Sequence, residues 1–573
     1  MTKQQELEQK FPYPKYEKYE PRPGNYVPEP GDETMYEYLL GCVGRLRADY
    51  GDYTAFINVD CKTPISRLLA DVEKFAAYLH GNGFGKGDVI TVFLPTCAHA
   101  YIVVYALSKL GIIADIVHPL TPPSELNAML DHTKSKGVII LDRLVAPHAE
   151  VLGDRFTVVC STADYTSGPI SLLVKLDDKK NSNVPDNVNF HRWRDVMKNS
   201  YGRAPTVSGG GHETALYMHG GGTTGKSKTV QLSAFAMNSL AHALYLLDRE
   251  HPYGKCCTLA VLPIFHAFGL GGILHYPLCN AYAALIMPKF DAKKANDYVK
   301  KYHVTEILGV PLMFKKMFAE ENFDNPGLKN LLFCFSGGDF VSEEMVEQID
   351  ARIAKNGGTG YFSRGWGLTE LSAVCAANNS SYYKKGSCGH AMQGLELAIF
   401  DGSGRRLPPG EVGEIAGRGA TMMNGYLPDE NVHDSGIWYD DEGRDWVLTG
   451  DMGYMDEEGY LFMSGRKKRI IVIAGYNVYP ATVEGKIEEI PFIREVCAAQ
   501  AYDAEGKPFM RLYVSLRDPA YGEEKAIAEL TKFCEDNFEV HTRPREICVI
   551  DAMPRTKMEK IDFLKLTETP PTA

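Results

Sequence analysis

The sequence predicts an α/β protein with a large N-terminal domain and a smaller α+β C-terminal domain. Three continuous apolar runs, at 89–94, 138–141 and 157–160, have the length of buried strands and alternate with stretches of helical periodicity. That alternation is typical of a mainly parallel sheet covered by helices. A basic run at 466–469 precedes a tail of strand-like and helix-like segments that is long enough to fold as a small domain. We therefore expect one domain over residues 1–467 and a second over 470–573.

The segments around the first strand follow the same alternation. Thr63-Pro64 is typical of a helix start, because a hydroxyl can cap the helix and proline fits its first turn. Apolar residues from Leu68 to Leu79 then recur on one helical face. Residues 163–212 are polar, and we expect them to form a surface excursion between core elements.

Composition excludes several classes of protein. The 573-residue chain has a formal net charge of −12, which argues against a general nucleic-acid binder. Its 13 cysteines include no Cys-x-x-Cys pair, so we expect neither a zinc site nor a disulfide framework. We expect instead a reducing, cytoplasmic compartment. The charged N-terminus lacks the apolar core of a signal peptide.

A long stretch between Lys255 and Lys289 contains no Asp, Glu, Lys or Arg. A membrane span needs about 20 mostly apolar residues, but Pro263, His266 and several glycines interrupt this stretch. A core strand, a loop and a buried helix fit it better, so we expect no integral span and leave peripheral association open.

The strongest local signal is the glycine-rich run at 220–228, because backbone N–H groups, hydroxyls and lysines together suit a polyphosphate. The run also satisfies G-x-x-x-x-G-K-[ST]. In a P-loop protein a helix starts at the Gly-Lys, whereas here 229–232 is strand-like and helical periodicity begins only near Ser233. We interpret the P-loop match as coincidental. The run reads Gly220-Gly221-Gly222-Thr223-Thr224-Gly225-Lys226-Ser227-Lys228.

This run resembles the phosphate-binding signature of adenylate-forming enzymes, which include acyl-CoA synthetases, luciferases and peptide-synthetase adenylation domains. Further segments resemble that family's motifs in the same order, over roughly residues 50–565. They are Leu262–Gly269 at the acyl pocket, Ser336-Gly337-Gly338 beside adenine, Gly365-Trp366-Gly367-Leu368-Thr369-Glu370, Thr449-Gly450-Asp451 with Gly465-Arg466 at the ribose, the loop starting at Gly475, and Pro554–Lys560 at the catalytic lysine.

The resemblance implies a large multi-sheet N-terminal adenylate-forming domain and a mobile α+β C-terminal lid. It also implies ATP and Mg²⁺ as cofactors and a role for each motif residue. The 220–228 run, with Gly220–Gly225 and Lys228, would hold the β- and γ-phosphates. Thr369 would contact the α-phosphate, Glu370 would hold Mg²⁺ and Lys560 would bridge the substrate carboxylate and the α-phosphate. Asp451 and Arg466 would bind the ribose, Gly337, Gly338, Trp366 and Gly367 would surround the adenine, and Gly475 would replace the lysine loop during thioester formation.

Some residues keep a second interpretation. Trp366 would stack on adenine or simply fill the core. His266 would lie beside the acyl carboxylate or serve as a hydrogen-bonded core residue. Phe268 and Gly269 would line the acyl pocket, and Gly271 and Gly272 either leave a tunnel open or permit close helix packing.

The sequence departs from the family pattern at several positions. Gly220 replaces Ser or Thr, Ser227 replaces Pro and Thr229 replaces Gly. Arg469 stands at the hinge, where Asp or Lys is usual, and Glu559 replaces the Gly before Lys560. None of these changes removes a group that the chemistry requires.

The resemblance implies ATP-dependent activation of a hydrophobic carboxylic acid to an acyl-adenylate, followed by transfer to coenzyme A. A fatty acid is the first expectation and an aryl acid the second. Two alternatives remain open: a ligase that loads a carrier-protein phosphopantetheine, and a nucleotide-binding homologue without catalysis. The oligomeric state is not predicted.

Overall fold

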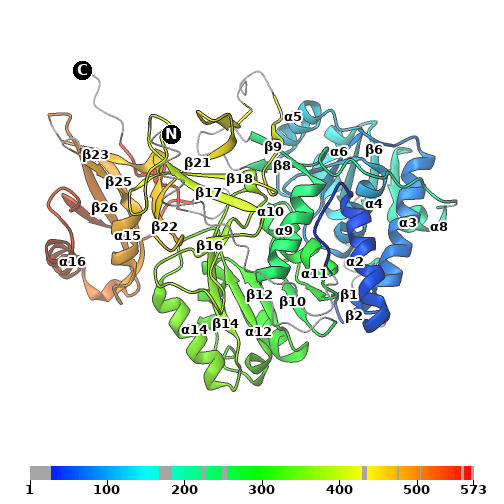
Figure 1. Ribbon diagram of the computed structural model, residues 1–573. Coiled ribbons are helices and arrows are strands. Elements are labelled where there is room, and N and C mark those ends of the chain that lie inside the picture. The colour runs from blue at the N-terminus through cyan, green and yellow to red at the C-terminus, as the bar shows by residue number, and fades with distance from the viewer. Residues whose placement is uncertain are drawn as a thin grey trace.

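Two large, mainly parallel sheets form the N-terminal part of the chain (Figure 1). The computed structural model describes residues 27–166, 184–200, 202–220, 228–247, 254–428, 435–473, 476–503, 505–555 and 561–568. The eight-stranded sheet contains the three strands that the apolar runs predict, β3, β5 and β6, as parallel neighbours. In spatial order its strands are β19 (Gly425–Tyr426), β9 (Lys228–Ser233), β8 (Thr214–Gly220), β4 (Ile113–Ile116), β3 (Val89–Phe93), β5 (Gly137–Leu141), β6 (Phe156–Cys160) and β7 (Phe190–Arg192).

The nine-stranded sheet has a parallel centre and antiparallel pairs at both edges. Its strands come from segments far apart in the sequence, because β1 and β2 join it beside β11. In spatial order they are β16 (His390–Ala391), β15 (Ala376–Ala377), β14 (Tyr361–Trp366), β13 (Phe333–Ser336), β12 (Glu306–Gly309), β10 (Cys257–Ala260), β11 (Ala283–Ile286), β1 (Thr54–Asn58) and β2 (Cys61–Pro64).

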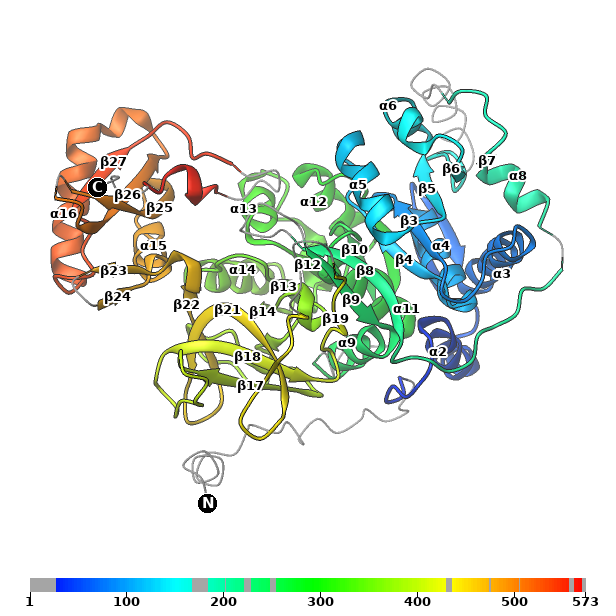
Figure 2. The same cartoon turned by 90° about the horizontal axis from the view of Figure 1, so that it is seen from above.

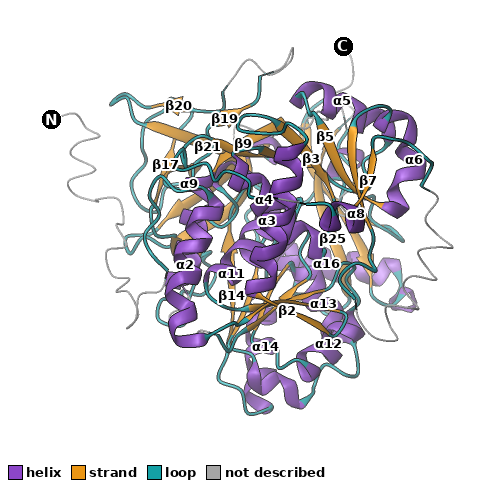
Figure 3. Ribbon diagram, turned by 90° about the vertical axis from the view of Figure 1, so that its right-hand side faces the viewer, coloured by secondary structure: helices purple, strands orange, loops and turns teal. Residues whose placement is uncertain are grey.

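A layer of helices lies between these two sheets, and further helices cover their outer faces (Figure 3). The shared layer holds α2 (Met35–Tyr50), α3 (Ile65–Gly81), α4 (Ala98–Leu110), α9 (Ala234–Leu247), and the continuous run of α10 (Ala267–Gly269), the π-helix η1 (Leu270–His275) and α11 (Tyr276–Cys279). Helix α8 (Trp193–Lys198) packs beside α3. The outer helices are α5 (Pro123–Thr133) and α6 (Asp142–Leu152) on one side, and α12 (Ala292–Lys301), α13 (Pro311–Ala319) and α14 (Glu343–Lys355) on the other.

A third, antiparallel sheet connects these layers to the C-terminal part (Figure 2). It consists of β17 (Leu395–Phe400), β18 (Gly413–Gly419), β21 (Asp445–Met455), β20 (Trp438–Tyr439) and β22 (Leu461–Arg466), and the 3-10 helix η4 (Lys467–Arg469) follows it. Beyond η4 lie β23 (Ile471–Ile473), β24 (Tyr476–Val478), α15 (Pro480–Glu488), β25 (Ile493–Tyr502), β26 (Pro508–Leu516), α16 (Glu523–Asn537) and β27 (Glu546–Val549). The remaining 3-10 helices are η2 (Pro326–Asn330), η3 (Thr369–Leu371), η5 (Pro519–Tyr521) and η6 (Phe563–Lys565).

The buried apolar residues of the C-terminal part form a cluster of their own. That cluster runs from Ile471 to Phe538, whereas the largest cluster spans Val27 to Leu461. The α/β multi-sheet architecture with a smaller C-terminal α+β unit is therefore the one that the sequence predicts.

The uncharged stretch after Lys255 forms β10, a loop and the α10–η1–α11 helical run, as predicted, and it also contains β11, which the sequence does not predict. Among the residues that the structure describes, no helix has both the length and the apolar character to cross a membrane. All 13 cysteines are free thiols.

Two predictions about the N-terminal part are wrong in detail. Thr63 lies in β2, and Pro64 precedes α3 without any side-chain cap, because residues 61–64 pair with β1. The polar stretch 163–212 is more than an excursion, since β7 extends the sheet and Trp193 at the start of α8 is 2% exposed. The part at 167–183 is outside the described residues.

Two glycines of the helical run serve close packing. A Cβ at Gly269 would lie 1.9 Å from the carbonyl oxygen of Pro263, and one at Gly271 would lie 2.3 Å from Cδ2 of Leu240. At Gly272 the nearest atoms are side chains of Leu308, at 3.0 Å, and Phe268, at 3.4 Å. The structure therefore favours packing for Gly269 and Gly271, while Gly272 lies against Phe268, a predicted pocket residue.

We expect Gly269→Ala to lower the thermal unfolding midpoint strongly, because the Pro263 carbonyl belongs to the backbone and cannot move away as a flexible side chain could. Overpacking of this kind costs about 1–3 kcal/mol or more. Gly44→Ala is the matched control: Gly44 lies exposed in α2 with no atom near its Cβ position, so alanine should raise stability by about 1 kcal/mol. Scanning calorimetry of both variants checks this, and an unchanged midpoint for Gly269→Ala would contradict the packing role.

Candidate active site

The glycine-rich run lies in a strand–loop–strand setting, as the sequence predicts. β8 and β9 are antiparallel, and Gly220 pairs with Lys228 at the mouth of the hairpin. Helix α9 begins only at Ala234, so the P-loop interpretation fails. The predicted phosphate-binding residues Gly221, Gly222, Thr223, Thr224 and Gly225 lie outside the described residues.

Beside this hairpin, the turn after β14 carries the predicted metal-binding carboxylate. Gly367 makes that turn possible, because a Cβ there would lie 1.4 Å from the carbonyl oxygen of Ala373. Thr369 and Glu370 follow in η3, both half-buried. The backbone oxygen of Glu370 accepts the Met423 N–H at 2.9 Å, which ties the turn to the segment before β19.

Tyr426 connects Glu370 with Lys228. Its hydroxyl donates to Oε1 of Glu370 at 2.8 Å, and the Lys228 ammonium lies 4.2 Å from the centre of its ring. Among the described residues, Oε2 of Glu370 has no hydrogen-bond partner, so one carboxylate oxygen is held and the other is available. The sequence analysis did not single out Tyr426, since a tyrosine in a short edge strand has no distinctive spacing.

The predicted ribose residues form a second cluster. Asp451 on β21 and Arg466 on β22 are paired in register, and Nε of Arg466 lies 2.7 Å from Oδ1 of Asp451. The indole N–H of Trp366 donates to Oδ2 of Asp451 at 2.8 Å. The Asp451 side chain is 3% exposed and that of Arg466 is 52% exposed, so the carboxylate is deep and the guanidinium is accessible. Trp366 itself is 7% exposed, and its stacking on adenine stays a prediction.

The loop predicted to lie beside adenine follows β13, the parallel neighbour of β14. Gly337 donates its N–H to the carbonyl of Gly309 at 3.2 Å, and a Cβ on Gly337 would lie 3.6 Å from the carbonyl oxygen of Gly365. Gly338 has a φ of +84°, which favours glycine. The loops after β13 and β14 thus lie side by side at the carboxyl ends of these parallel strands, where α/β sheets bind ligands.

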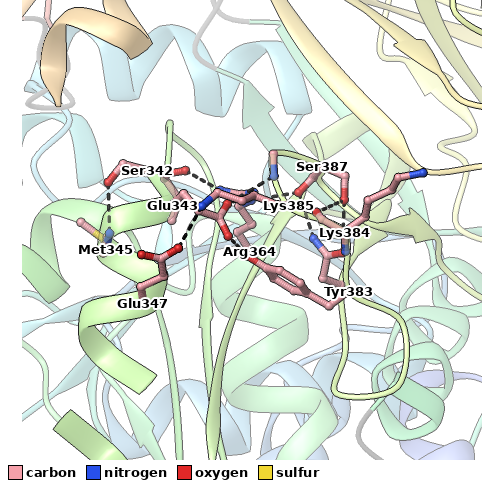
Figure 4. Close-up of polar contacts among 12 residues, drawn as sticks. Ser342, Glu343, Met345, Glu347, Arg364, Tyr383, Lys384, Lys385 and Ser387 are labelled. Atoms are coloured by element: carbon pink, nitrogen blue, oxygen red, sulfur yellow. Dashed lines mark hydrogen bonds and ion pairs between the residues drawn. The ribbon is translucent and has the colours of Figure 1, made fainter. Parts of the chain in front are cut away.

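A buried arginine fixes the strand from which Trp366 projects (Figure 4). Arg364 donates to the carbonyls of Val341 at 3.0 Å and Ser387 at 2.9 Å, and to Oε2 of Glu343 at 2.6 Å. Burial raises the pKa of Glu343, but the Tyr383 hydroxyl and the Arg364 guanidinium outweigh it and lower that pKa overall. Arg364 is a further residue that the sequence analysis missed, because a single arginine inside a strand carries no motif.

The predicted acyl-pocket residues lie at the start of the α10–η1–α11 run. His266 precedes α10, and its carbonyl accepts the Leu270 N–H at 2.9 Å. Its ring is half-buried beside that of Phe265, with the ring centres 5.0 Å apart. Phe268 lies 5.7 Å from Phe335 of β13, measured between ring centres, so this run reaches the strand before the loop that is predicted to lie beside adenine.

The predicted hinge residue is anchored in the C-terminal part. Arg469 donates to both carboxylate oxygens of Glu484 on α15 and to the carbonyl of Ala498 at 3.1 Å. Burial lowers the pKa of Arg469, but the Glu484 carboxylate outweighs it and raises that pKa overall. Lys560, Glu559 and Gly475 lie outside the described residues, so their predicted roles stay predictions.

Comparisons with known proteins show the family to which the chain belongs. The sequence model of the family described as "AMP-binding enzyme" matches residues 45–427. The chain is 29% identical to a long-chain-fatty-acid–CoA ligase of Bacillus subtilis (strain 168), over 91% of this chain and 92% of that protein. It is 26% identical to 4-coumarate–CoA ligase 2 of Oryza sativa subsp. japonica, over 87% and 85%.

Solved structures share the fold. ATP-bound MatB from Rhodopseudomonas palustris superposes with a TM-score of 0.76 at 20% identity, covering 94% of this chain and 98% of that one. A benzoate CoA ligase from Burkholderia xenovorans LB400 gives the same TM-score of 0.76 at 20% identity, covering 93% of this chain and 100% of that one. The family match extends over more than half of the chain and includes the β8–β9 hairpin and the 366–370 turn, so the chain belongs to the AMP-binding enzyme family.

Proposed function

We propose that the protein is an AMP-forming acid–thiol ligase that activates a hydrophobic carboxylic acid with ATP and transfers the acyl group to coenzyme A. The carboxylate attacks the α-phosphorus of ATP, the bond to pyrophosphate breaks, and an acyl-adenylate forms. The thiol then attacks the acyl carbon and AMP leaves. Charge gathers on phosphate oxygens in the first step, so positioned cations and hydrogen-bond donors supply most of the catalysis.

One observation carries this proposal. The turn 366–370 is bonded at one end to Asp451, the predicted ribose carboxylate, and at the other to Tyr426, which lies under Lys228 of the phosphate hairpin. A single short segment therefore joins the residues predicted to bind the ribose to those predicted to bind the polyphosphate. A nucleoside triphosphate needs both kinds of site in one pocket.

The residues at the turn also fit a magnesium ion. Mg²⁺ takes hard oxygen ligands and is usually held by one or two carboxylates together with substrate phosphates. Glu370 offers one such oxygen, and the described residues contain no cluster of three or more His, Cys, Asp or Glu that could hold a metal alone. Glu370 would hold the ion, which neutralises phosphate charge when bound.

The acid is proposed to be a medium- or long-chain fatty acid, with an aryl acid second. The uncharged α10–η1–α11 run beside Phe335 and the fatty-acid and coumarate ligases among the relatives support this. The names of these relatives favour coenzyme A over a carrier protein as the thiol. The fatty-acid ligase among the relatives supports a role in fatty-acid metabolism, and free thiols at all 13 cysteines support a reducing compartment such as the cytoplasm.

The test is a panel of fatty and aryl acids, with AMP release and thioester mass measured for each. Thioester formed with free coenzyme A supports the proposal. AMP release with free acid and no thioester, through hydrolysis of the adenylate, would mean that coenzyme A is not the acceptor and would favour a carrier-protein thiol. The absence of pyrophosphate exchange with every acid would contradict ligase activity.

Glu370→Gln should weaken the use of Mg·ATP while the fold stays intact, because it removes one charge and keeps the shape. We expect a loss of about 10²-fold or more in pyrophosphate exchange. Exchange is measured across a Mg²⁺ titration, with the thermal unfolding midpoint as the control for folding. A wild-type rate at every Mg²⁺ concentration would mean that Glu370 is not the metal-binding carboxylate.

Trp366→Phe should impair the enzyme mainly through Asp451, because the ring is largely kept but the donor to Oδ2 is lost. We expect the KM for ATP to rise about tenfold or more, because the loss of a hydrogen bond to a charged group is worth about 1.5–3 kcal/mol. The rise in KM should be smaller when 2′,3′-dideoxy-ATP replaces ATP, since that nucleotide has no ribose hydroxyl that could donate a hydrogen bond to Asp451. An equal rise with both nucleotides would argue that Trp366 acts on the base alone.

Lys560→Ala should separate the two half-reactions. We propose that the unit 470–573 turns against 1–467 between the steps, so the lysine acts only in adenylate formation. The variant should fail to form acyl-adenylate yet still convert supplied acyl-adenylate to thioester, with each step timed by chromatography. Lys565→Ala, at an exposed lysine that pairs with Asp562 at 3.4 Å, is the matched control. If Lys560→Ala slows both steps equally, the alternation is wrong.

A further inference from the structure

We infer that Tyr426 is a positioning residue that couples the metal-binding carboxylate to the phosphate-binding lysine, acting through its hydroxyl on Glu370 and through its ring on Lys228. This inference rests on the proposed function, because it concerns the same nucleotide site. It assigns a role to a residue outside the phosphate, ribose and lysine motifs.

The hydroxyl contact restricts Glu370. A carboxylate at the end of a short turn can rotate, and rotation spreads its two oxygens over several directions. The Tyr426 O–H holds Oε1 at 2.8 Å and so directs Oε2 away from the tyrosine. Groups that hold a metal-binding carboxylate in this way commonly change metal affinity 10- to 100-fold when they are removed.

The ring contact restricts Lys228. Its ammonium lies 4.2 Å from the ring centre, within the range in which the face of an aromatic ring attracts a cation. A lysine has four rotatable side-chain bonds, so a face that holds the ammonium near the hairpin mouth lowers the entropy cost of meeting a phosphate. One side chain therefore places a cation and an anion near each other without letting them pair directly.

The tyrosine is itself firmly held by its surroundings. Its backbone pairs with Val230 of β9, and its N–H donates to the carbonyl of Ser435 at 2.9 Å. Gly436 leaves room for the ring, since a Cβ there would lie 2.3 Å from Cε2 of Tyr426. The backbone of β19 is thus fixed to the strand that carries Lys228, and the ring is confined between that strand and Glu370.

Two substitutions separate the two contacts. Tyr426→Phe removes the hydroxyl and keeps the ring, whereas Tyr426→Leu removes both. Tyr439→Phe is the matched control, because Tyr439 is 64% exposed on β20. ATP binding is measured by titration calorimetry without an acid substrate, so that no turnover occurs, first with a chelator and then with saturating Mg²⁺.

The wild type should bind ATP more tightly with Mg²⁺ than without it. For Tyr426→Phe we expect the affinity for ATP without Mg²⁺ to stay within about twofold of wild type. The increase in ATP affinity that Mg²⁺ causes should be roughly tenfold smaller than in the wild type. For Tyr426→Leu we expect, in addition, a several-fold loss of metal-free affinity. In a Glu370→Gln background, Tyr426→Phe should change the Mg²⁺ dependence no further, because the two residues act on one contact.

Three results would overturn the inference. One is an increase in ATP affinity with Mg²⁺ that is as large in Tyr426→Phe as in the wild type. Another is an equal affinity for ATP without Mg²⁺ in Tyr426→Phe and Tyr426→Leu. The third is a similar loss of ATP affinity with and without Mg²⁺, together with a lower thermal unfolding midpoint. That result would mean that Tyr426 only stabilises the fold. Pyrophosphate exchange by the wild type tests the proposed function separately, since ATP binding and its Mg²⁺ dependence can be measured even if no acid is activated.

Discussion

The geometry of the site depends on one steric constraint, the tight turn at Gly367. A Cβ at this position would overlap the carbonyl of Ala373, and one at Gly365 would lie 2.4 Å from the carbonyl of Ala376. The chain after β14 can fold back this closely only because both residues are glycine. The same turn places Ser372 and Ala373 at φ values of 57° and 93°, a conformation that costs about 1–3 kcal/mol per residue where the surroundings impose it. Strain of this kind is typical of functional sites.

That turn holds its direction because buried polar contacts fix the strand before it. Arg364 joins β14 to the segments at Val341 and Ser387, and its charge is balanced by Glu343. Removing one partner of a buried ion pair costs about 3–5 kcal/mol, because it leaves an uncompensated charge. The arginine therefore ties two segments, at 341–343 and at Ser387, to the strand that presents Trp366. Small shifts in either of them would move the indole N–H away from Asp451.

The sequence predicts the fold class and the order of the motifs because both depend on local signals. Apolar runs indicate β3, β5 and β6, and the strand-like residues after Lys228 distinguish the hairpin from a P-loop. It does not predict contacts that join distant segments, such as Tyr426 with Glu370 or Arg364 with Ser387, since these depend on tertiary packing. The same limitation explains the error at Thr63, where pairing of β2 with β1 overrides a local helix-start signal, and the packing role of Gly269, which only the nearby Pro263 carbonyl reveals.

The anchoring of three basic residues narrows the position of the proposed hinge. Arg466 binds Asp451, and Lys467 binds Glu414 at 2.6 Å, so both are held by the antiparallel sheet of the N-terminal part. Two residues later Arg469 is held by Glu484 and Ala498, and Ile471 belongs to the C-terminal hydrophobic cluster. The change of attachment from one part to the other therefore falls between Lys467 and Arg469. An arginine at this position suits such a hinge, because its planar guanidinium holds a carboxylate with two hydrogen bonds and so ties the hinge residue to the C-terminal part. Arg466, the predicted ribose-binding arginine, lies only three positions earlier and is paired with Asp451 in the N-terminal part, so rotation about this point would leave that ion pair in place.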